Sequence, residues 1–157
     1  MVEFALILPV FLIMVFGGIT AAISYEHKED IVHAVRDGAR YGATLPYTQC
    51  DSGGCPSSRT WAEQVKYVTI ARSGGSLSSS DDVCVALVTG SATPPATPAV
   101  YGTASKYSTT GSACFTDNTG DTNARVQVSA SHSGDKINLV FRTINVTVSS
   151  SATERHE

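Results

Sequence analysis

Four cysteines, Cys50, Cys55, Cys84 and Cys114, are the residues whose types and spacing most clearly suggest chemistry. A zinc site would need four converging ligands in closer pairs, for example with two residues between the members of each pair. An even number of cysteines in a chain with an export-like N-terminal segment favours disulfides instead. Two glycines allow the short Cys50–Cys55 loop to close, and the other two cysteines lie in short apolar runs. Of the three connectivities, we predict Cys50–Cys55 and Cys84–Cys114.

The other residues that could do chemistry are dispersed along the chain. The four histidines have no HExxH-type spacing and no neighbouring cysteine, and no G-x-S-x-G, P-loop or dinucleotide-binding motif occurs. The acids Asp81-Asp82 and Asp117 to Asp121 could bind calcium, but neither pair approaches an EF-hand pattern, and such acids usually form solvated turns. We predict no catalytic residue, no metal site, no cofactor and no enzymatic activity.

The element that must position the rest of the chain is its N-terminal segment. From Phe4 to Tyr25 the chain runs for 22 residues without a charged side chain, which at about 1.5 Å per residue could cross a hydrocarbon layer of about 30 Å. Beyond it, mostly apolar or small residues recur every three to four positions: Ile23, His27, Ile31, Ala34 or Val35, Gly38, and Tyr41 or Gly42. We predict one helix over 1–45, with residues 1–25 as a membrane or filament-core half and 26–157 as a globular domain that includes the amphipathic half.

Several residues of the apolar half suggest a role in assembly. An unpaired Glu3 carboxylate in hydrocarbon would cost several kcal/mol, so it must be neutral, at the headgroup level, or paired with a terminal ammonium group. Pro9 and the pair Gly17-Gly18 weaken the helix, so we expect this half to be bent or locally melted. Such a helix could repack against copies of itself. We predict the assembly residues Glu3, Phe4, Pro9, Gly17 and Gly18.

Two motifs, Val2-Glu3-Phe4-Ala5-Leu6-Ile7-Leu8-Pro9 and Ala34-Val35-Arg36-Asp37-Gly38-Ala39-Arg40-Tyr41, resemble the TadE-like pilins of the tight adherence (Flp) branch of type IV pilus systems. The motifs and their spacing cover about a quarter of the chain. The resemblance implies that a prepilin peptidase removes a short basic leader ending in Gly, and that the product assembles through its helix with an ATP-driven machinery. The family's glutamate, usually the fifth residue after processing, would correspond to Glu3, so the processed N-terminus stays open.

Length and composition favour one small extracytoplasmic domain behind the apolar half. The chain has 157 residues, of which about 130 remain for a folded core. The 42% hydrophobic share is concentrated in the N-terminal run, whereas the remainder is rich in Ser, Thr and Gly. A formal net charge of -3 gives no basic field, which argues against a nucleic-acid partner.

The remaining elements follow from local patterns. Ser57 or Ser58 is expected to cap a helix over 59–72, with Trp61, Val65, Val68 and Arg72 on one face and Ser73-Gly74-Gly75 at its end. Residues 83–88 are apolar on both faces and are expected to form a central strand. Further strands are expected over 113–115, 124–131 and 143–148, with Arg125, Gln127, Ser129 and Ser131 facing outward. We expect a loop over 90–107, turns over 117–121 and 133–135, and a loose tail over 149–157.

Together these patterns predict an α+β, type IV pilin-like fold. A long N-terminal helix packs its C-terminal half on a small antiparallel sheet of about four strands, with one short extra helix and disulfides. The leading hypothesis is a pilin that waits in the cytoplasmic membrane and then joins an extracellular filament with copies of itself or related pilins. The alternatives are a minor pseudopilin that primes or tips a filament of another pilin, and a singly membrane-anchored surface binding module.

Overall fold

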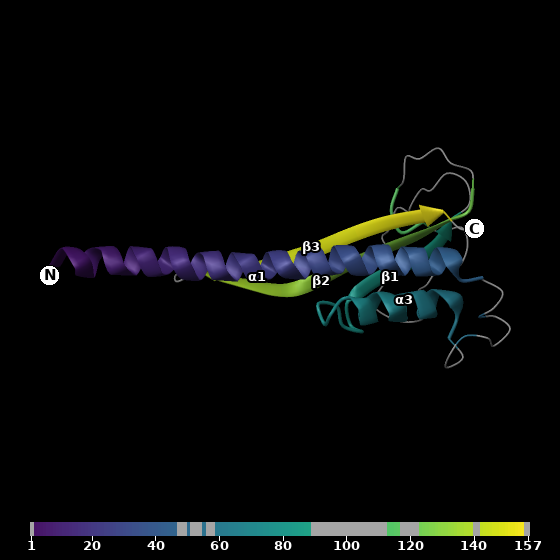
Figure 1. The fold of residues 1–157 in the computed structure, drawn as a ribbon, viewed down its shortest axis with the longest axis horizontal. Coiled ribbons are helices and arrows are strands. Elements are labelled where there is room, and N and C mark those ends of the chain that lie inside the picture. Colours follow the sequence, from purple (N-terminus) through teal and green to yellow (C-terminus); the bar gives the residue numbers. More distant parts are fainter. Residues whose placement is uncertain are drawn as a thin grey trace.

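The structure is a computed structural model that describes residues 2–46, 50, 55, 59–88, 113–116, 123–139 and 142–155. The elements follow one another in the order α1 (Val2–Thr44), α3 (Trp61–Arg72), β1 (Asp82–Val88), β2 (Arg125–Leu139) and β3 (Arg142–Arg155). The C-terminal half of α1 lies against α3 and the sheet, and β2 and β3 continue beside part of its N-terminal half, whose first turns extend beyond the rest of the chain (Figure 1). This arrangement confirms the predicted α+β pilin-like fold.

Helix α1 is continuous over 43 residues, which confirms the single long helix predicted over 1–45. The expected bend or local melting is wrong for this chain, because Pro9, Gly17 and Gly18 all lie inside uninterrupted helix and Figure 1 shows a nearly straight rod. Proline removes one backbone donor, and each glycine costs only about 1 kcal/mol relative to alanine. The hydrogen bonds on either side are enough to carry the helix through these positions.

Helix α3 begins at Trp61, two residues after the start predicted from the sequence. The N-cap is Thr60, whose side chain accepts a hydrogen bond from the Glu63 backbone N–H at 3.3 Å, while the Thr60 N–H donates to the Glu63 carboxylate at 2.9 Å. This Thr-x-x-Glu spacing is a recognised start signal, and the expected cap at Ser57 or Ser58 is wrong. Gly74 and Gly75, with φ of +62° and +100°, turn the chain away at the other end, as predicted.

Small residues on α1 allow α3 to approach closely. A Cβ atom at Gly38 would overlap the Thr69 hydroxyl, and one at Gly42 would lie 3.0 Å from side-chain atoms of Val65 and Val126. The fully buried Trp61 packs in the same core, and its indole N–H donates to the Leu45 carbonyl at 3.2 Å.

The stripe predicted for α1 is confirmed from Ile31 onward, where Ile31, Ala34, Val35, Gly38 and Gly42 are buried. It is wrong at Ile23, whose side chain is 49% exposed. On α3 the predicted face is only partly right, because Arg72 is exposed and Val68 only half-buried. The core there is completed by Thr69 instead.

The described strands form one antiparallel sheet in the order β1-β2-β3. In its register, Val85 pairs with Val128 and Val128 with Ala152. The expectation that 83–88 forms a central strand is therefore wrong for the described sheet, because β2 is central and β1 lies at an edge. Val83 and Val85 belong to the main core with α1, and Val126, Val128 and Ala130 of β2 join them.

The second face of the sheet is covered by residues 113–116. Ala113 and Cys114 pack against Ala86 and Val88 of β1, which is why β1 is apolar on both sides. The Gln127 side chain holds this segment: its carbonyl oxygen accepts from the Cys114 N–H at 3.0 Å and its amide group donates to the Phe115 carbonyl at 3.1 Å.

Two sequence predictions fail at this cover. The expected strand at 113–115 is wrong, because an amide side chain takes the place of a backbone ladder. The outward exposure expected for Arg125, Gln127, Ser129 and Ser131 is also wrong, since the first two are buried and the two serines half-buried.

Strands β2 and β3 are longer than the sequence patterns indicated. The turn expected at 133–135 is instead a register irregularity inside the β2–β3 ladder, between Ser133 and Asp135. The tail expected to be loose from Ser149 is part of β3 as far as Arg155. The loop expected at 90–107 and the turn at 117–121 lie outside the described residues.

Both predicted disulfides are present. Cys50–Cys55 joins residues whose Cα atoms are 4.6 Å apart, and Cys84–Cys114 spans 5.8 Å between Cα atoms. The second bond ties β1 to the segment that covers its far face, across a sequence separation of 30 residues. On the chain-entropy model, a loop of this length contributes somewhat under about 4 kcal/mol and the short one about 2 kcal/mol.

Candidate functional site

The N-terminal half of α1 carries a large bare apolar surface. Every large hydrophobic side chain that is exposed in the described residues, except Tyr67, lies between Phe4 and Tyr25. Phe4 and Met14 are each 72% exposed. The helix is long and apolar enough to cross a membrane by length and composition, and none of its most apolar window is buried by the rest of the chain. Monomeric soluble proteins rarely expose an apolar surface of this extent, so this half needs lipid or another apolar surface around it.

The predicted assembly residues lie on or next to this surface. Phe4 is exposed, Gly17 is half-buried, and a Cβ atom at Gly18 would meet nothing within 4 Å. Pro9 is an exposed residue of the helix interior. Glu3 is helical, but its side chain is outside the described set, so its pairing with an ammonium group stays a prediction.

Hydroxyl groups in the apolar half are satisfied by the helix itself. The Thr20 hydroxyl lies 3.1 Å from the Phe16 carbonyl oxygen and 3.0 Å from that of Gly17, and Ser24 donates to the Thr20 carbonyl at 3.2 Å. A polar group in hydrocarbon needs such an internal partner, because water is absent there. These two residues were not singled out from the sequence, although a hydroxyl residue in an uncharged run is a usable signal.

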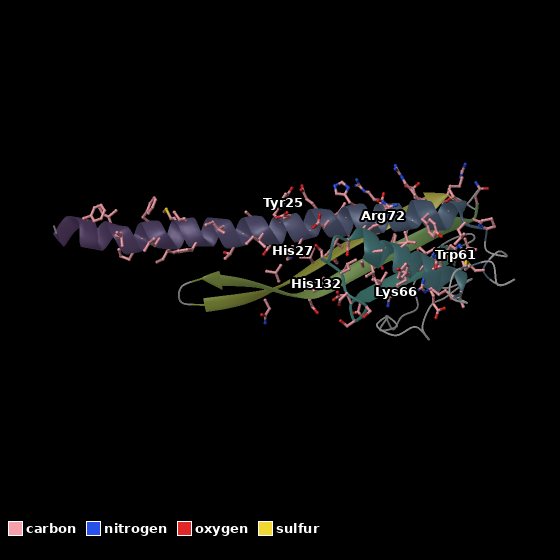
Figure 2. The ribbon with its side chains drawn as sticks, turned by 60° about the horizontal axis from the view of Figure 1, so that its bottom comes forward. Tyr25, His27, Trp61, Lys66, Arg72 and His132 are labelled. Carbon is pink, nitrogen blue, oxygen red and sulfur yellow. A yellow bond between two sulfur atoms is a disulfide. The ribbon has the colours of Figure 1, made fainter. Side chains whose placement is uncertain are left out.

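The charged residues that follow mark a change of environment along α1. Figure 2 shows Tyr25 and His27 where the bare half gives way to the half packed in the domain. Tyr25 is 63% exposed and His27 half-buried. Farther along, Arg40 forms an ion pair with Glu154 of β3, with 3.7 Å between nitrogen and oxygen. This exposed pair contributes little to stability, but it shows which part of β3 lies beside which part of α1.

The most developed polar cluster elsewhere holds the loop between α3 and β1. The Asp81 carboxylate accepts from the Ser78 backbone N–H at 2.6 Å and from its hydroxyl at 2.8 Å, and it contacts Nδ1 of His132 on β2 at 2.8 Å. Burial raises the pKa of Asp81, but the hydrogen bonds from Ser78 and the interaction with His132 together hold the pKa below its ordinary value. All these contacts link parts of the fold, so we assign the cluster a structural role.

The calcium alternative gains no support from the described residues. Asp81 is engaged by Ser78 and His132, Asp82 is exposed, and no group of three or more His, Cys, Asp or Glu side chains that could hold a metal ion occurs among the residues described. Asp117 and Asp121 lie outside that set. The zinc alternative fails because all four cysteines are in disulfides.

Comparison with known proteins identifies the N-terminal segment. Residues 1–40 match the family model described as TadE-like protein, which confirms the resemblance stated from the two motifs. The match covers the apolar half of α1 and most of its amphipathic half. No curated protein and no solved structure matches the chain.

Proposed function

We propose that this chain, which begins with a TadE-like segment over residues 1–40, is a structural subunit of an extracellular Tad-like pilus. The observation that carries the proposal is the bare apolar half of α1, which continues without a break into a disulfide-bonded domain. A helix of this kind can reside in lipid and later in a bundle of similar helices. The folded domain would then form the filament surface.

The free energy of such a helix differs little between lipid and a bundle of similar helices, because both surroundings are apolar. Without a hydrophobic driving force between helices in lipid, association depends on packing and on the pairing of polar groups. In this proposal the cytoplasmic membrane holds the subunit first, after a prepilin peptidase has processed it. Neighbouring copies or related pilins then replace the lipid with the help of the assembly machinery, and the Glu3 carboxylate pairs with a terminal ammonium group.

We propose a structural rather than an enzymatic role. Among the described residues, the chemically active side chains hold the fold together: the cysteines form disulfides, and Asp81 and His132 fasten a loop to β2. Within the TadE-like segment, the run from Phe4 to Tyr25 carries no charged side chain and is suited to packing.

Replacing Glu3 tests the pairing on which assembly depends. Glu3→Gln removes the charge but keeps the shape, and an unpaired ammonium group left in an apolar bundle costs several kcal/mol. Because each 1.4 kcal/mol is a factor of about ten, we expect at least a tenfold loss of filaments counted by electron microscopy of sheared cells. Glu26→Gln, which removes an exposed carboxylate just beyond the apolar half, is the matched control. Normal filament numbers in the Glu3 variant would refute the pairing.

The same sheared material distinguishes this function from the two alternatives, a minor pseudopilin and a singly membrane-anchored binding module. Mass spectrometry of purified filaments gives the abundance of the chain and its processed N-terminus. A major subunit would be the dominant protein along the filament, whereas a minor pseudopilin would be present in trace amounts or at one end. A singly anchored binding module would stay with the membranes and be absent from the fibres.

A further inference from the structure

The side of α1 that faces away from the sheet is exposed both in the bare half and in the half packed in the domain. Figure 2 shows Tyr25 and His27 on opposite sides of the helix, with the sheet on the side of His27. The side toward the sheet is half-buried even within the bare half, at Ile13, Gly17, Thr20 and Ser24. We call the side of Tyr25 the outer face of α1. Its members, all of them exposed, are Phe4, Leu8, Phe11, Val15, Gly18, Ala22, Tyr25, Glu29 and Arg36.

The outer face repeats every seven residues. Residues seven apart lie on nearly the same side of a helix, because two turns take about seven residues. One row of this face is Phe4, Phe11, Gly18 and Tyr25, and the other is Leu8, Val15, Ala22, Glu29 and Arg36. Beyond Tyr25 the surface is hollowed by about 270 Å³, with a lining of Tyr25, Lys28, Glu29, Val32, His33 and Arg36. Large side chains, a gap, a hollow and two opposite charges therefore follow one another at a single spacing.

A parallel copy displaced by seven residues, about 10.5 Å along the helix, matches the apolar part of this pattern. Phe11 of one copy is then level with Gly18 of the other, where an added Cβ would meet nothing within 4 Å. Tyr25, whose side chain is 63% exposed, is level with Val32 in the hollow. Two rings thus face two places with room for them, and glycine allows the backbones of two helices to approach closely.

The charges select this displacement. Without displacement, Glu29 would lie beside Glu29 and Arg36 beside Arg36, and like charges at a contact are unfavourable. A displacement of seven residues places Glu29 of one copy beside Arg36 of the other, and neither residue has an ion pair within the part of the chain that the structure describes. An antiparallel contact could also pair them, but it would direct the two bare halves away from each other and leave both uncovered.

We propose that a second copy of this chain docks in parallel on the outer face of α1, displaced by seven residues, with Glu29 of one copy paired with Arg36 of the next. The inference rests on the proposed filament and adds the contact face and the displacement between neighbours. Each copy still offers Arg36 to one neighbour and Glu29 to another, so the contact does not close and can extend into an array. The charged pair lies beyond the bare half, where it selects the displacement without entering the apolar bundle.

Charge reversal tests the pair in cells that assemble the wild-type chain. Glu29→Arg and Arg36→Glu each bring like charges together, and we expect each to lower the number of sheared filaments at least about tenfold. The double variant restores opposite charges and should return to within about twofold of wild type. Lys28→Glu with Glu29→Arg also keeps the net charge but lacks the pair, so filament number should stay low. Because these side chains are exposed, subunit levels and circular dichroism should match the wild type throughout.

Cysteine cross-linking measures the displacement without changing a charge. Gly18→Cys with Tyr25→Cys places two thiols about 10.5 Å apart along one helix, too far for a disulfide within the chain. In neighbouring copies the two thiols are level with each other. Mild oxidation of filaments should therefore give a ladder of linked subunits on a non-reducing gel. Gly18→Cys with Ala22→Cys, the matched control for a displacement of four residues, should give no ladder.

The outcomes separate this inference from the proposed function. Filaments that contain the chain but give no ladder from the Gly18 and Tyr25 positions would overturn the displacement and leave the filament role intact. A double charge variant that is folded but fails to restore filaments would overturn the pairing between copies, in favour of another pilin as the neighbour. Absence of the wild-type chain from sheared filaments would overturn the proposed function and this inference with it.

Discussion

The two halves of α1 show how one helix can serve two environments. Toward the C-terminus, residues from Ile31 to Ala43 pack against α3 and the sheet, with Gly38 and Gly42 at the closest approach. Toward the N-terminus, large apolar side chains stand exposed and Gly18 faces open space. Glycine therefore has opposite consequences in the two halves. In the covered half, Gly38 and Gly42 determine whether the domain can pack, and in the bare half Gly18 can act only through a partner.

The largest effect should come from shortening an aromatic side chain of α3 that packs against the covered half. Trp61→Ala removes a fully buried indole and its hydrogen bond to Leu45, and we expect the domain to lose about 3–5 kcal/mol of unfolding free energy. Phe11→Ala in the bare half is the matched change and should leave that free energy unchanged. Chemical denaturation in detergent, followed by circular dichroism, measures both. Equal losses would contradict the division of α1.

Adding one methyl group to a glycine in each half, Gly38 and Gly18, sharpens the comparison. Gly38→Ala forces the new Cβ against the Thr69 side chain, and we expect a loss of about 1–3 kcal/mol from overpacking. Gly18→Ala meets nothing within 4 Å and should raise helix stability slightly, by up to about 1 kcal/mol. Thermal melts of the two variants should move in opposite directions. If Gly18→Ala nevertheless reduces filament number, the glycine is needed between subunits.

Acid should weaken the loop that the Asp81 cluster holds. Since the folded-state pKa of Asp81 lies below its ordinary value of 3.8, the stability it contributes is present above that value and is lost as the pH falls through the lower folded-state pKa. The difference in unfolding free energy between wild type and Asp81→Asn should therefore shrink below about pH 4. Asp82→Asn, which changes an exposed neighbour, provides the control. A difference that stays constant down to pH 2 would show that the charge contributes nothing.

The smallest effect is expected at the ion pair between Arg40 of α1 and Glu154 of β3. Arg40→Gln breaks a contact between side chains that are 75% and 40% exposed, and such pairs contribute about 0–1 kcal/mol. The unfolding free energy should fall by less than about 1 kcal/mol, and this difference should depend only weakly on salt concentration. A larger loss would mean that the alignment of the hairpin depends on this contact.

The sequence predicted those features that depend on neighbouring residues. The extent of α1 followed from a run without charges and then a stripe at helical spacing, and the short loop Cys50–Cys55 followed from its two glycines. The end of helix α3 at Arg72 was predicted correctly, but the helix begins at Trp61 rather than at residue 59, because the signal that fixes its start is the Thr60–Glu63 spacing rather than the serines before it. The bare half, with Phe4, Gly17 and Gly18, was likewise visible as an uncharged run.

What the sequence did not predict depends on distant contacts. Strand β1 is apolar on both faces because residues 113–116 cover its far side, and no local pattern reveals that cover. Gln127 was expected outside because it alternates with valines, yet it is buried since its amide group replaces a backbone ladder. The Ser/Thr-rich end of β3 lacks an apolar alternation and is ordered by its pairing with β2. The hairpin beside α1 was missed because 133–135 was expected to be a turn.

The unbroken course of α1 has a geometric consequence for any assembly. Each residue of an α-helix advances the direction of the next side chain by about 100°, and nothing in α1 between Val2 and Thr44 interrupts that advance. In a filament of the proposed kind, the angular position of the domain around the filament axis would therefore be dictated by the way the first turns of the helix interlock. Inserting one residue just after the first turns would swing the domain by more than a quarter of a circle, and would change the outer pattern of a fibre of the proposed kind without altering any contact inside the domain.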